Sequence, residues 1–134
     1  MFESLNWPAI LVATLAAFGF GALWYSPLLF GKRWQRELGF TDQYLRQGNF
    51  AVIFGRGLLF TFLMTLGVAL FLAPYENPHL HHGLHVGLLA GLLIGAVSLA
   101  NNYNYQRRSL VLWLIDGGYT FFLILIVALI LSAW

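Results

Sequence analysis

Residues 83–100 read GLHVGLLAGLLIGAVSLA, a stretch that contains no lysine, arginine, aspartate or glutamate. A helix that crosses a bilayer needs about 20 consecutive, mostly apolar residues. Three other stretches of similar length and character occupy residues 8–30, 50–73 and 110–134. The sequence therefore predicts four transmembrane helices joined by short polar segments.

The composition predicts an all-α integral membrane protein and leaves no room for a separate soluble domain. Hydrophobic residues make up 60% of the 134 residues and charged residues only 9%, whereas a soluble domain carries about 25% charged residues. We place the four helices at about 8–26, 50–73, 83–100 and 110–132, within one domain over residues 1–134. The chain has no cysteine, which excludes disulfides, thiolate metal sites and cysteine nucleophiles.

The basic residues indicate the orientation in the membrane. All seven lie between the first and second predicted helices, at the start of the second, or between the third and fourth: Lys32, Arg33, Arg36, Arg46, Arg56, Arg107 and Arg108. Cytoplasmic loops carry the excess of lysine and arginine in membrane proteins. We therefore expect both basic loops in the cytoplasm and both termini outside, with membrane lipid as a partner and no nucleic acid.

The segment LLFGKRWQREL (28–38) predicts a short amphipathic helix. Phe30, Trp34 and Leu38 are four residues apart, and the basic residues lie off that face. A helix of this kind lies in the membrane interface with its apolar face toward the acyl chains. We expect it on the cytoplasmic leaflet.

Small residues recur every four positions in two predicted helices. They form a stripe on one face of each helix: Ala9, Ala13, Ala17 and Gly21 in the first, and Gly83, Gly87, Gly91 and Gly95 in the third. Small residues let transmembrane helices pack closely, so we expect glycine-zipper packing within or between subunits. Because the fourth helix has no stripe, we expect the first three helices to form the core and the fourth to face lipid or a neighbouring subunit.

The two halves of the sequence resemble each other. The two stripes have the same spacing, and VALFLA (68–73) is similar to VALILS (127–132). This pattern favours a duplicated helical hairpin, with two parallel halves, as in many transporters. The alternative is chance similarity between helices that share an apolar composition.

Asp116 is the only acid inside a predicted helix. A charged side chain at the bilayer centre costs about 2.5–3.5 kcal/mol on insertion scales and usually has a partner. Arg56 lies at a similar depth in the second helix, so we predict an Arg56–Asp116 ion pair. The pair either only fixes helix packing or takes part in proton coupling or ligand binding.

Further polar residues are expected near the same end of the bundle. They end the first and third helices or follow Asp116 by one turn: Tyr25, Ser26, Asn101, Asn102 and Tyr119. One interpretation is that they satisfy the free backbone groups at helix ends. The other is a small pocket that opens toward the cytoplasm.

The four histidines of the chain all lie in HLHHGLH (79–85), at the outer start of the third helix. His81, His82 and His85 have the i, i+3 and i, i+4 spacings that can chelate a metal, and imidazole suits zinc, copper or nickel. No thiol is present, and Glu76 is the only nearby carboxylate. We favour a polar helix entrance over a metal site and expect no cofactor.

Two motifs resemble the bacterial membrane family catalogued as domain of unknown function 1761. They are GALWYSPLLFGKRW (21–34) and NNYNYQRRSLVLWLIDGGY (101–119). Where the family pattern has an acid before the arginines, this chain has Gln106. The resemblance implies a protein of the bacterial inner membrane and no particular activity.

The sequence supports two main functional hypotheses. The first is an oligomeric small transporter or channel, because an intramembrane acid and duplicated halves are typical of such proteins. The second is an accessory or scaffold subunit of a larger membrane complex, because the chain is short and apolar. The motifs GxSxG and HExxH and a phosphate-binding loop are missing, so we do not expect an enzyme.

Overall fold

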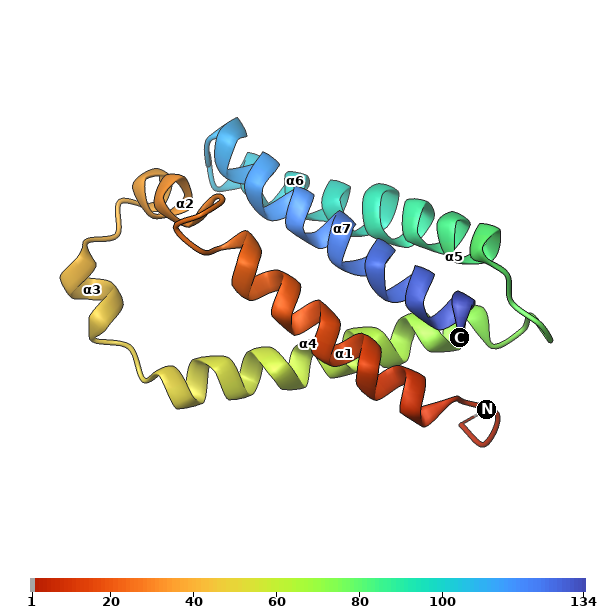
Figure 1. Cartoon of the computed structure of the whole chain (residues 1–134). Helices are drawn as coiled ribbons and strands as arrows, with labels where there is room; N and C mark the ends of the chain where they lie inside the picture. Colours follow the sequence, from red (N-terminus) through yellow and green to blue (C-terminus); the bar gives the residue numbers. More distant parts are fainter. Residues whose placement is uncertain (1) are drawn as a thin grey trace.

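A computed structural model describes residues 2–134 of the chain, and this part is helical and contains no strand (Figure 1). The elements in chain order are α1 (Trp7–Trp24), α2 (Gly31–Leu38), α3 (Asp42–Arg46), α4 (Phe50–Leu72), α5 (Leu80–Val86), the π-helix η1 (Gly87–Ala96), α6 (Val97–Tyr105) and α7 (Leu110–Ala133). The elements α5, η1 and α6 follow one another without a break and form a single long helix.

Four helices are long and apolar enough to cross a membrane: Trp7–Trp24, Phe50–Leu72, Leu80–Tyr105 and Leu110–Ala133. They confirm four spans and indicate a multi-pass membrane protein. The third helix is longer than the predicted 83–100 at both ends. It therefore includes His81, His82, Asn101 and Asn102, which were expected to flank it.

Side-chain caps explain where three of the long helices begin. Asn6, Asn49 and Ser109 precede α1, α4 and α7, and the side chain of each accepts a hydrogen bond from a backbone N–H in the first turn. The first N–H groups of a helix have no partner inside the helix, and such caps satisfy one of them. The helix starts are therefore local properties of the sequence.

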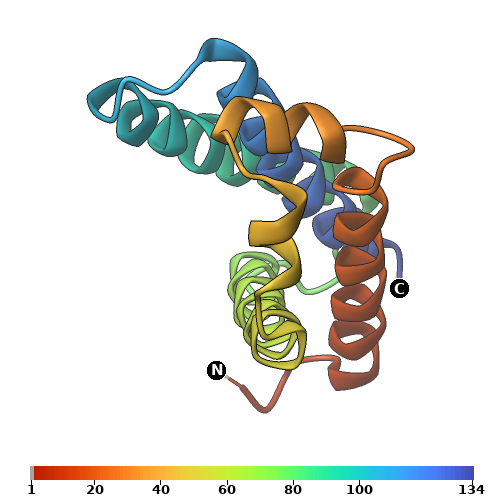
Figure 2. The same cartoon turned by 90° about the vertical axis from the view of Figure 1, so that its left-hand side faces the viewer.

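The helix α7 lies at the centre of the bundle, where it contacts α1, α4, α5 and η1 (Figures 1 and 2). Its side chains Leu112 and Val127 are among the largest fully buried ones. The prediction that the fourth helix faces lipid while the first three form the core is therefore wrong. Bulky side chains on α7 fill the space that the small residues of its neighbours leave open, so a helix without a stripe of small residues fits in the middle.

The glycines of the third helix all face α7. A Cβ atom at Gly83, Gly87, Gly91 or Gly95 would meet α7 atoms within contact distance. In an α-helix of about 3.6 residues per turn, a residue four positions on lies slightly past a full turn. A π-helix holds more residues per turn because its hydrogen bonds run from i to i+5, so the same step falls slightly short. The change from α5 to η1 thus keeps the four glycines in line along α7.

The small residues of α1 face the other side of the core. Ala9, Ala13 and Ala17 are at most 1% exposed. Ala13 and Ala17 pack in one apolar cluster with Val68 and Leu72 of α4 and with side chains of α7. The first and third helices therefore both bring small residues to the bundle interior.

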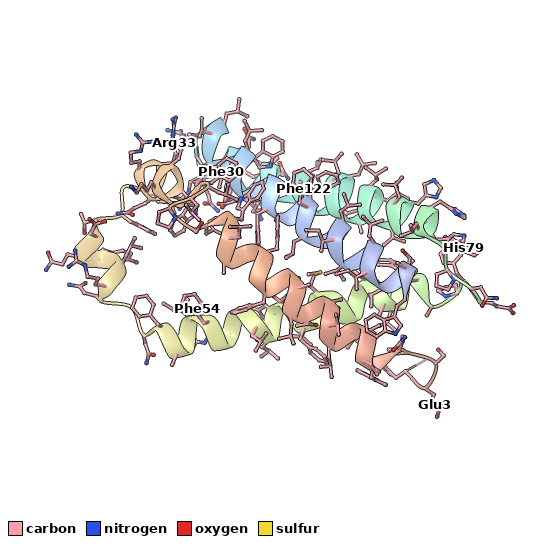
Figure 3. All side chains as sticks on the ribbon, in the orientation of Figure 1. Glu3, Phe30, Arg33, Phe54, His79 and Phe122 are labelled. Carbon is pink, nitrogen blue, oxygen red and sulfur yellow. The ribbon has the colours of Figure 1, made fainter. Side chains whose placement is uncertain are left out.

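The helix α4 packs against the bundle with its second half only. Its buried residues are Thr61, Thr65, Val68, Ala69 and Leu72, and residues 50–60 are exposed or only partly buried. Figure 1 shows the first half of α4 diverging from α1, with α2 and α3 connecting the separated ends. We refer to this end of the molecule as the basic end, and to the opposite end, with the termini and His79, as the histidine end (Figure 3).

Substitution of Gly87 by alanine is expected to destabilise the protein by about 1–3 kcal/mol, the usual cost of overpacking. The new Cβ would lie 2.9 Å from the Leu125 Cα atom of α7. Gly19→Ala is the matched control, because a Cβ at Gly19 meets nothing within 4 Å, and alanine is the better helix former. Thermal unfolding of both variants in the same detergent tests the packing, and equal melting temperatures would contradict it.

Candidate functional site

The carboxylate of Asp116 lies where three helices meet near the basic end. Its Oδ1 accepts a hydrogen bond from the Tyr25 hydroxyl at 2.5 Å, just after the end of α1. Its Oδ2 accepts a hydrogen bond from the hydroxyl of Tyr103 on α6. A carboxylate that accepts on both oxygens has the bonding pattern of the ionised form. The site thus joins α1, α6 and α7 through one side chain.

The Tyr25 hydroxyl is a donor that keeps its proton. Burial raises its pKa above the ordinary value, and the hydrogen bond to Asp116 raises it further. Deprotonated, this hydroxyl would place a second negative charge beside the carboxylate, which the surroundings disfavour. Tyr25 therefore serves as a hydrogen-bond donor to Asp116 over the physiological pH range.

Gly118 leaves space for the ring of Trp24, at the end of α1. A Cβ at Gly118 would lie 3.2 Å from the Trp24 ring. The Trp24 indole N–H donates to the backbone carbonyl of Ile115 at 3.0 Å. Helical carbonyls have a second lone pair to offer, so α1 is attached to the backbone of α7 one residue before Asp116.

Gly117 makes room for a second tryptophan. A Cβ there would lie 2.9 Å from the indole nitrogen of Trp113 in the same helix. The indole N–H of Trp113 donates to the Ala96 carbonyl at 2.8 Å, at the end of η1. The segment WLIDGGY (113–119) therefore contains the residues through which α7 contacts α1 and η1.

A glycine of the first motif (21–34) leaves space for a side chain of the second motif (101–119). A Cβ at Gly21 would lie 3.0 Å from the Tyr119 hydroxyl oxygen. A Cβ at Gly31 would overlap the backbone carbonyl of Tyr25, so only glycine allows the turn after α1 to close on itself here. Both glycines belong to GALWYSPLLFG (21–31), and they hold Tyr25 in position for Asp116.

A large cleft opens beside Tyr25 and Tyr119, between α1 and the divergent half of α4. Its volume is about 1180 Å³, and it is lined by Phe18, Gly21, Ala22, Tyr25, Trp34, Phe40, Tyr44, Leu45, Gln47, Gly48, Phe50, Ile53, Phe54, Gly57, Thr61 and Tyr119. Figure 3 shows Phe54 on the α4 side of this region. We call it the aromatic cleft. Tyr25 connects it to the carboxylate of Asp116.

The helix α2 is attached to the start of α7 by Glu37. Its carboxylate accepts hydrogen bonds from the Ser109 hydroxyl at 2.7 Å and from the Arg33 Nε–H at 2.9 Å. The hydrogen bond from Ser109, followed by that from Arg33, holds the pKa of Glu37 below its ordinary value. Since Ser109 also caps α7, this contact holds the α2 wall of the aromatic cleft against the bundle.

The predicted Arg56–Asp116 ion pair is wrong. Within residues 2–134, the ion pair of the structure is Arg33–Glu37. Arg56 is exposed in the half of α4 that diverges from the bundle, whereas Asp116 is partly buried and bonded to tyrosines. Arg56 and Asp116 have similar positions along their predicted helices. They do not meet, because α4 crosses the bundle at an angle (Figure 1).

The predicted polar cluster is only partly brought together. Tyr25 and Tyr119 meet, with ring centroids 5.0 Å apart, and both line the aromatic cleft. The Ser26 hydroxyl donates to the Leu23 carbonyl and so satisfies a helix end. Asn101 and Asn102 are exposed in the interior of α6, so their prediction as members of a pocket or as helix caps is wrong. The α-helix simply continues past them to Tyr105.

The histidines lie in the first turns of α5 at the other end of the molecule. The Nδ1 atom of His82 accepts a hydrogen bond from the backbone N–H of His79 at 2.9 Å, so this side chain caps the helix. In the described part of the chain, no three histidine, aspartate or glutamate side chains are grouped as metal ligands. The structure thus does not assemble His81, His82 and His85 into a metal site.

Tyr103 and Trp34 are site residues that the sequence reasoning did not identify. Trp34 was predicted only on the apolar face of the amphipathic helix over residues 28–38, and no role was predicted for Tyr103. Tyr103 instead donates to Asp116, and Trp34 lines the aromatic cleft on α2. A signal for Tyr103 was its position in the same motif as Asp116.

The family described as Protein of unknown function (DUF1761) matches residues 8–132. The chain belongs to the DUF1761 family. No curated protein and no solved structure matches it. In this DUF1761 protein the two motifs that suggested the family, 21–34 and 101–119, contact each other through Tyr25, Trp24 and Asp116.

Removal of one hydroxyl from the site is expected to lower stability by about 1–2 kcal/mol, the range for hydrogen bonds to charged groups and between transmembrane helices. Tyr25→Phe and Tyr103→Phe each leave one Asp116 oxygen without its donor. Tyr105→Phe is the control, because Tyr105 is 77% exposed. Thermal unfolding measures the effect. The site contributes nothing to stability if all three variants melt together.

The Glu37 contact is expected to weaken in acid. Because the pKa of Glu37 is lower in the folded protein, its contribution to stability is present above the ordinary value of about 4.3 and is lost as the pH falls through the lowered pKa. Wild-type protein should therefore melt above Glu37→Gln at pH 7, and the difference should shrink below pH 4. A difference that is independent of pH would show that Glu37 does not act through its charge.

Proposed function

We propose that this protein is a small transporter in which Asp116 is the proton-binding group. The observation that carries the proposal is the link from the Asp116 carboxylate through the Tyr25 hydroxyl to the aromatic cleft. Asp116 is the only acidic residue within the four membrane-length helices. Ionisable groups in such helices are costly and usually functional.

Uptake of a proton by Asp116 would change the hydrogen bonds between helices. A proton from water adds to one carboxylate oxygen and turns it from an acceptor into a donor. Both oxygens now accept from tyrosine hydroxyls, so the tyrosine at the protonated oxygen has to redirect its own hydroxyl proton and become an acceptor. Because Tyr25 follows α1 and Tyr103 belongs to α6, protonation would replace a charge-assisted hydrogen bond between α7 and one of them by a neutral, weaker one. This is a two-state element of the kind that coupled transport requires.

A second copy of the chain would complete the transport path. The aromatic cleft is open at the side of the molecule, and four helices with a packed core enclose no continuous passage. We propose a homo-oligomer in which a neighbouring copy covers the cleft. The duplicated hairpin predicted from the sequence fits such a transporter, since many transporters consist of repeats.

We propose the orientation and location predicted from the sequence: the bacterial inner membrane, with the basic end in the cytoplasm and both termini outside. The support is the bias of lysine and arginine to cytoplasmic loops. The helix α2 carries Lys32, Arg33 and Arg36 on one side and Trp34 and Leu38 on another, as expected for an amphipathic helix in the membrane interface.

A second candidate is an accessory subunit of a membrane complex. It is favoured by the first half of α4, where Ile53 and Phe60 are more than half exposed. Native mass spectrometry of the gently extracted protein separates the two. A homo-oligomer supports the transporter, and a fixed complex with another protein supports the accessory subunit.

Transport is tested in proteoliposomes that contain a trapped pH indicator and receive a panel of organic cations, anions and neutral compounds. A proton-coupled transporter should move protons when its substrate is added, and Asp116→Asn should reduce this to the level of empty liposomes. Asp42→Asn is the matched control, because Asp42 is exposed on α3, outside the spans. The proposal fails if no compound moves protons or if Asp116→Asn is as active as Asp42→Asn.

A further inference from the structure

We infer that the aromatic cleft binds a lipophilic organic cation. This inference names a substrate class for the proposed transport function and rests on it. Half of the side chains that line the cleft are aromatic, and none of them is charged. A site of this composition has apolar surface for a hydrophobic ligand, and it can recognise the charge of the ligand through aromatic faces, hydroxyl groups and the side-chain amide of Gln47.

Aromatic rings form a continuous series along one side of the cleft. The ring centroids are 5.0 Å apart for Tyr119–Tyr25, 5.7 Å for Tyr25–Trp34, 5.7 Å for Trp34–Phe40 and 4.6 Å for Phe40–Tyr44. The series passes from α7 over the end of α1 and over α2 to α3. A ligand in the cleft therefore meets ring faces and edges over its whole length.

The helix α4 supplies a second aromatic wall. Phe50 and Phe54 stack with their centroids 6.0 Å apart, and both line the cleft. Phe54 is 57% exposed, so its ring is available for contact. Aromatic faces carry the negative part of the ring quadrupole and attract cations placed over them.

A carboxylate lies directly behind one residue of the cleft wall. The Tyr25 hydroxyl donates its proton to Asp116, and a donor polarised in this way gains negative charge on its oxygen. That oxygen belongs to a residue of the cleft wall. A cation in the cleft is stabilised by this oxygen and by the carboxylate behind it, and an anion is destabilised.

The basic residues beside the cleft do not reverse this preference. Arg33, Arg46 and Arg56 are neighbours of lining residues in the sequence, but all three are exposed and none of them lines the cleft. Arg33 is also paired with Glu37. Water and ions screen exposed charges over about 8 Å at physiological salt, whereas the Asp116 charge acts through the protein interior. The negative charge of Asp116 therefore lies behind the cleft wall, and the basic residues lie on the exposed surface beside the cleft.

The size and position of the cleft indicate a bulky ligand that is soluble in the membrane. Its volume of about 1180 Å³ exceeds the usual range of about 300–1,000 Å³ for small-molecule pockets. It lies between α1 and α4, two helices long and apolar enough to cross a membrane. An aromatic or alkyl cation that partitions into lipid can cover the apolar wall, whereas a small hydrated ion would leave most of it uncovered.

The inference is tested with tetraphenylphosphonium and tetraphenylborate, two ions of nearly the same size and shape and of opposite charge. Binding to the purified full-length protein in a zwitterionic detergent is measured by isothermal titration calorimetry, with protein-free micelles as the blank. We expect one saturable site for the cation and at least about tenfold weaker binding of the anion. Asp116→Asn should reduce this preference severalfold by weakening cation binding.

Two α4 variants locate the site. Phe54→Leu is expected to weaken binding of the cation about three- to tenfold, the range for loss of one cation–π contact. Phe60→Leu is the matched control: Phe60 is 62% exposed on the same helix and does not line the cleft. Equal affinities of these two variants would place the bound ion elsewhere and overturn the inference.

The remaining outcomes are equally informative. Equal or tighter binding of the anion would mean that the cleft recognises apolar shape alone, as a lipid acyl chain would require, and would overturn the inference. Absence of saturable binding would overturn it as well. If the cation binds as expected but no compound moves protons in proteoliposomes, the ligand class stands and the transport proposal fails. Proton movement driven only by anions would leave transport standing and refute the ligand class.

Discussion

A carboxylate inside an apolar helix needs hydrogen-bond donors, and for Asp116 the donors come from two other helices. Tyr25 and Tyr103 each donate one hydroxyl. This requirement sets the positions of the end of α1 and of α6 relative to α7. The indole N–H groups of Trp24 and Trp113 donate to backbone carbonyls nearby and also hold these helices in position.

Close packing of α7 makes this arrangement possible. The glycines of the third helix bring α7 near enough for Trp113 to reach the Ala96 carbonyl. The alanines of α1 allow similarly close packing on the other side of α7, where Ala13 and Ala17 are fully buried. In lipid, helices gain stability from such close contact and not from hydrophobic exclusion of water. The bulkiest helix therefore lies in the centre, surrounded by helices with small residues.

The divergence of α4 has the opposite effect and leaves the aromatic cleft open. Only its second half shares the core, so the first half leaves room for the aromatic cleft beside Tyr25. The short helices α2 and α3 connect α1 to α4 across this opening (Figure 2), and Glu37 attaches α2 to α7. Asp116, the aromatic cleft and the segment with α2 and α3 therefore lie at the same end of the molecule.

The sequence by itself determined the four membrane-length helices and the presence of one acid, Asp116, within them, and two motifs indicated the family. The helices and the lone acid follow from length, apolar composition and charge, which are properties of each helix alone. The tertiary structure decided which residues Asp116 meets, that α7 is central, and that α4 diverges. Contacts between helices depend on crossing angles and on which faces meet, and two residues at one depth, such as Arg56 and Asp116, can lie far apart around the bundle. Periodicity shows that a helix has a small-residue face, but only the packed structure shows which partner fills it.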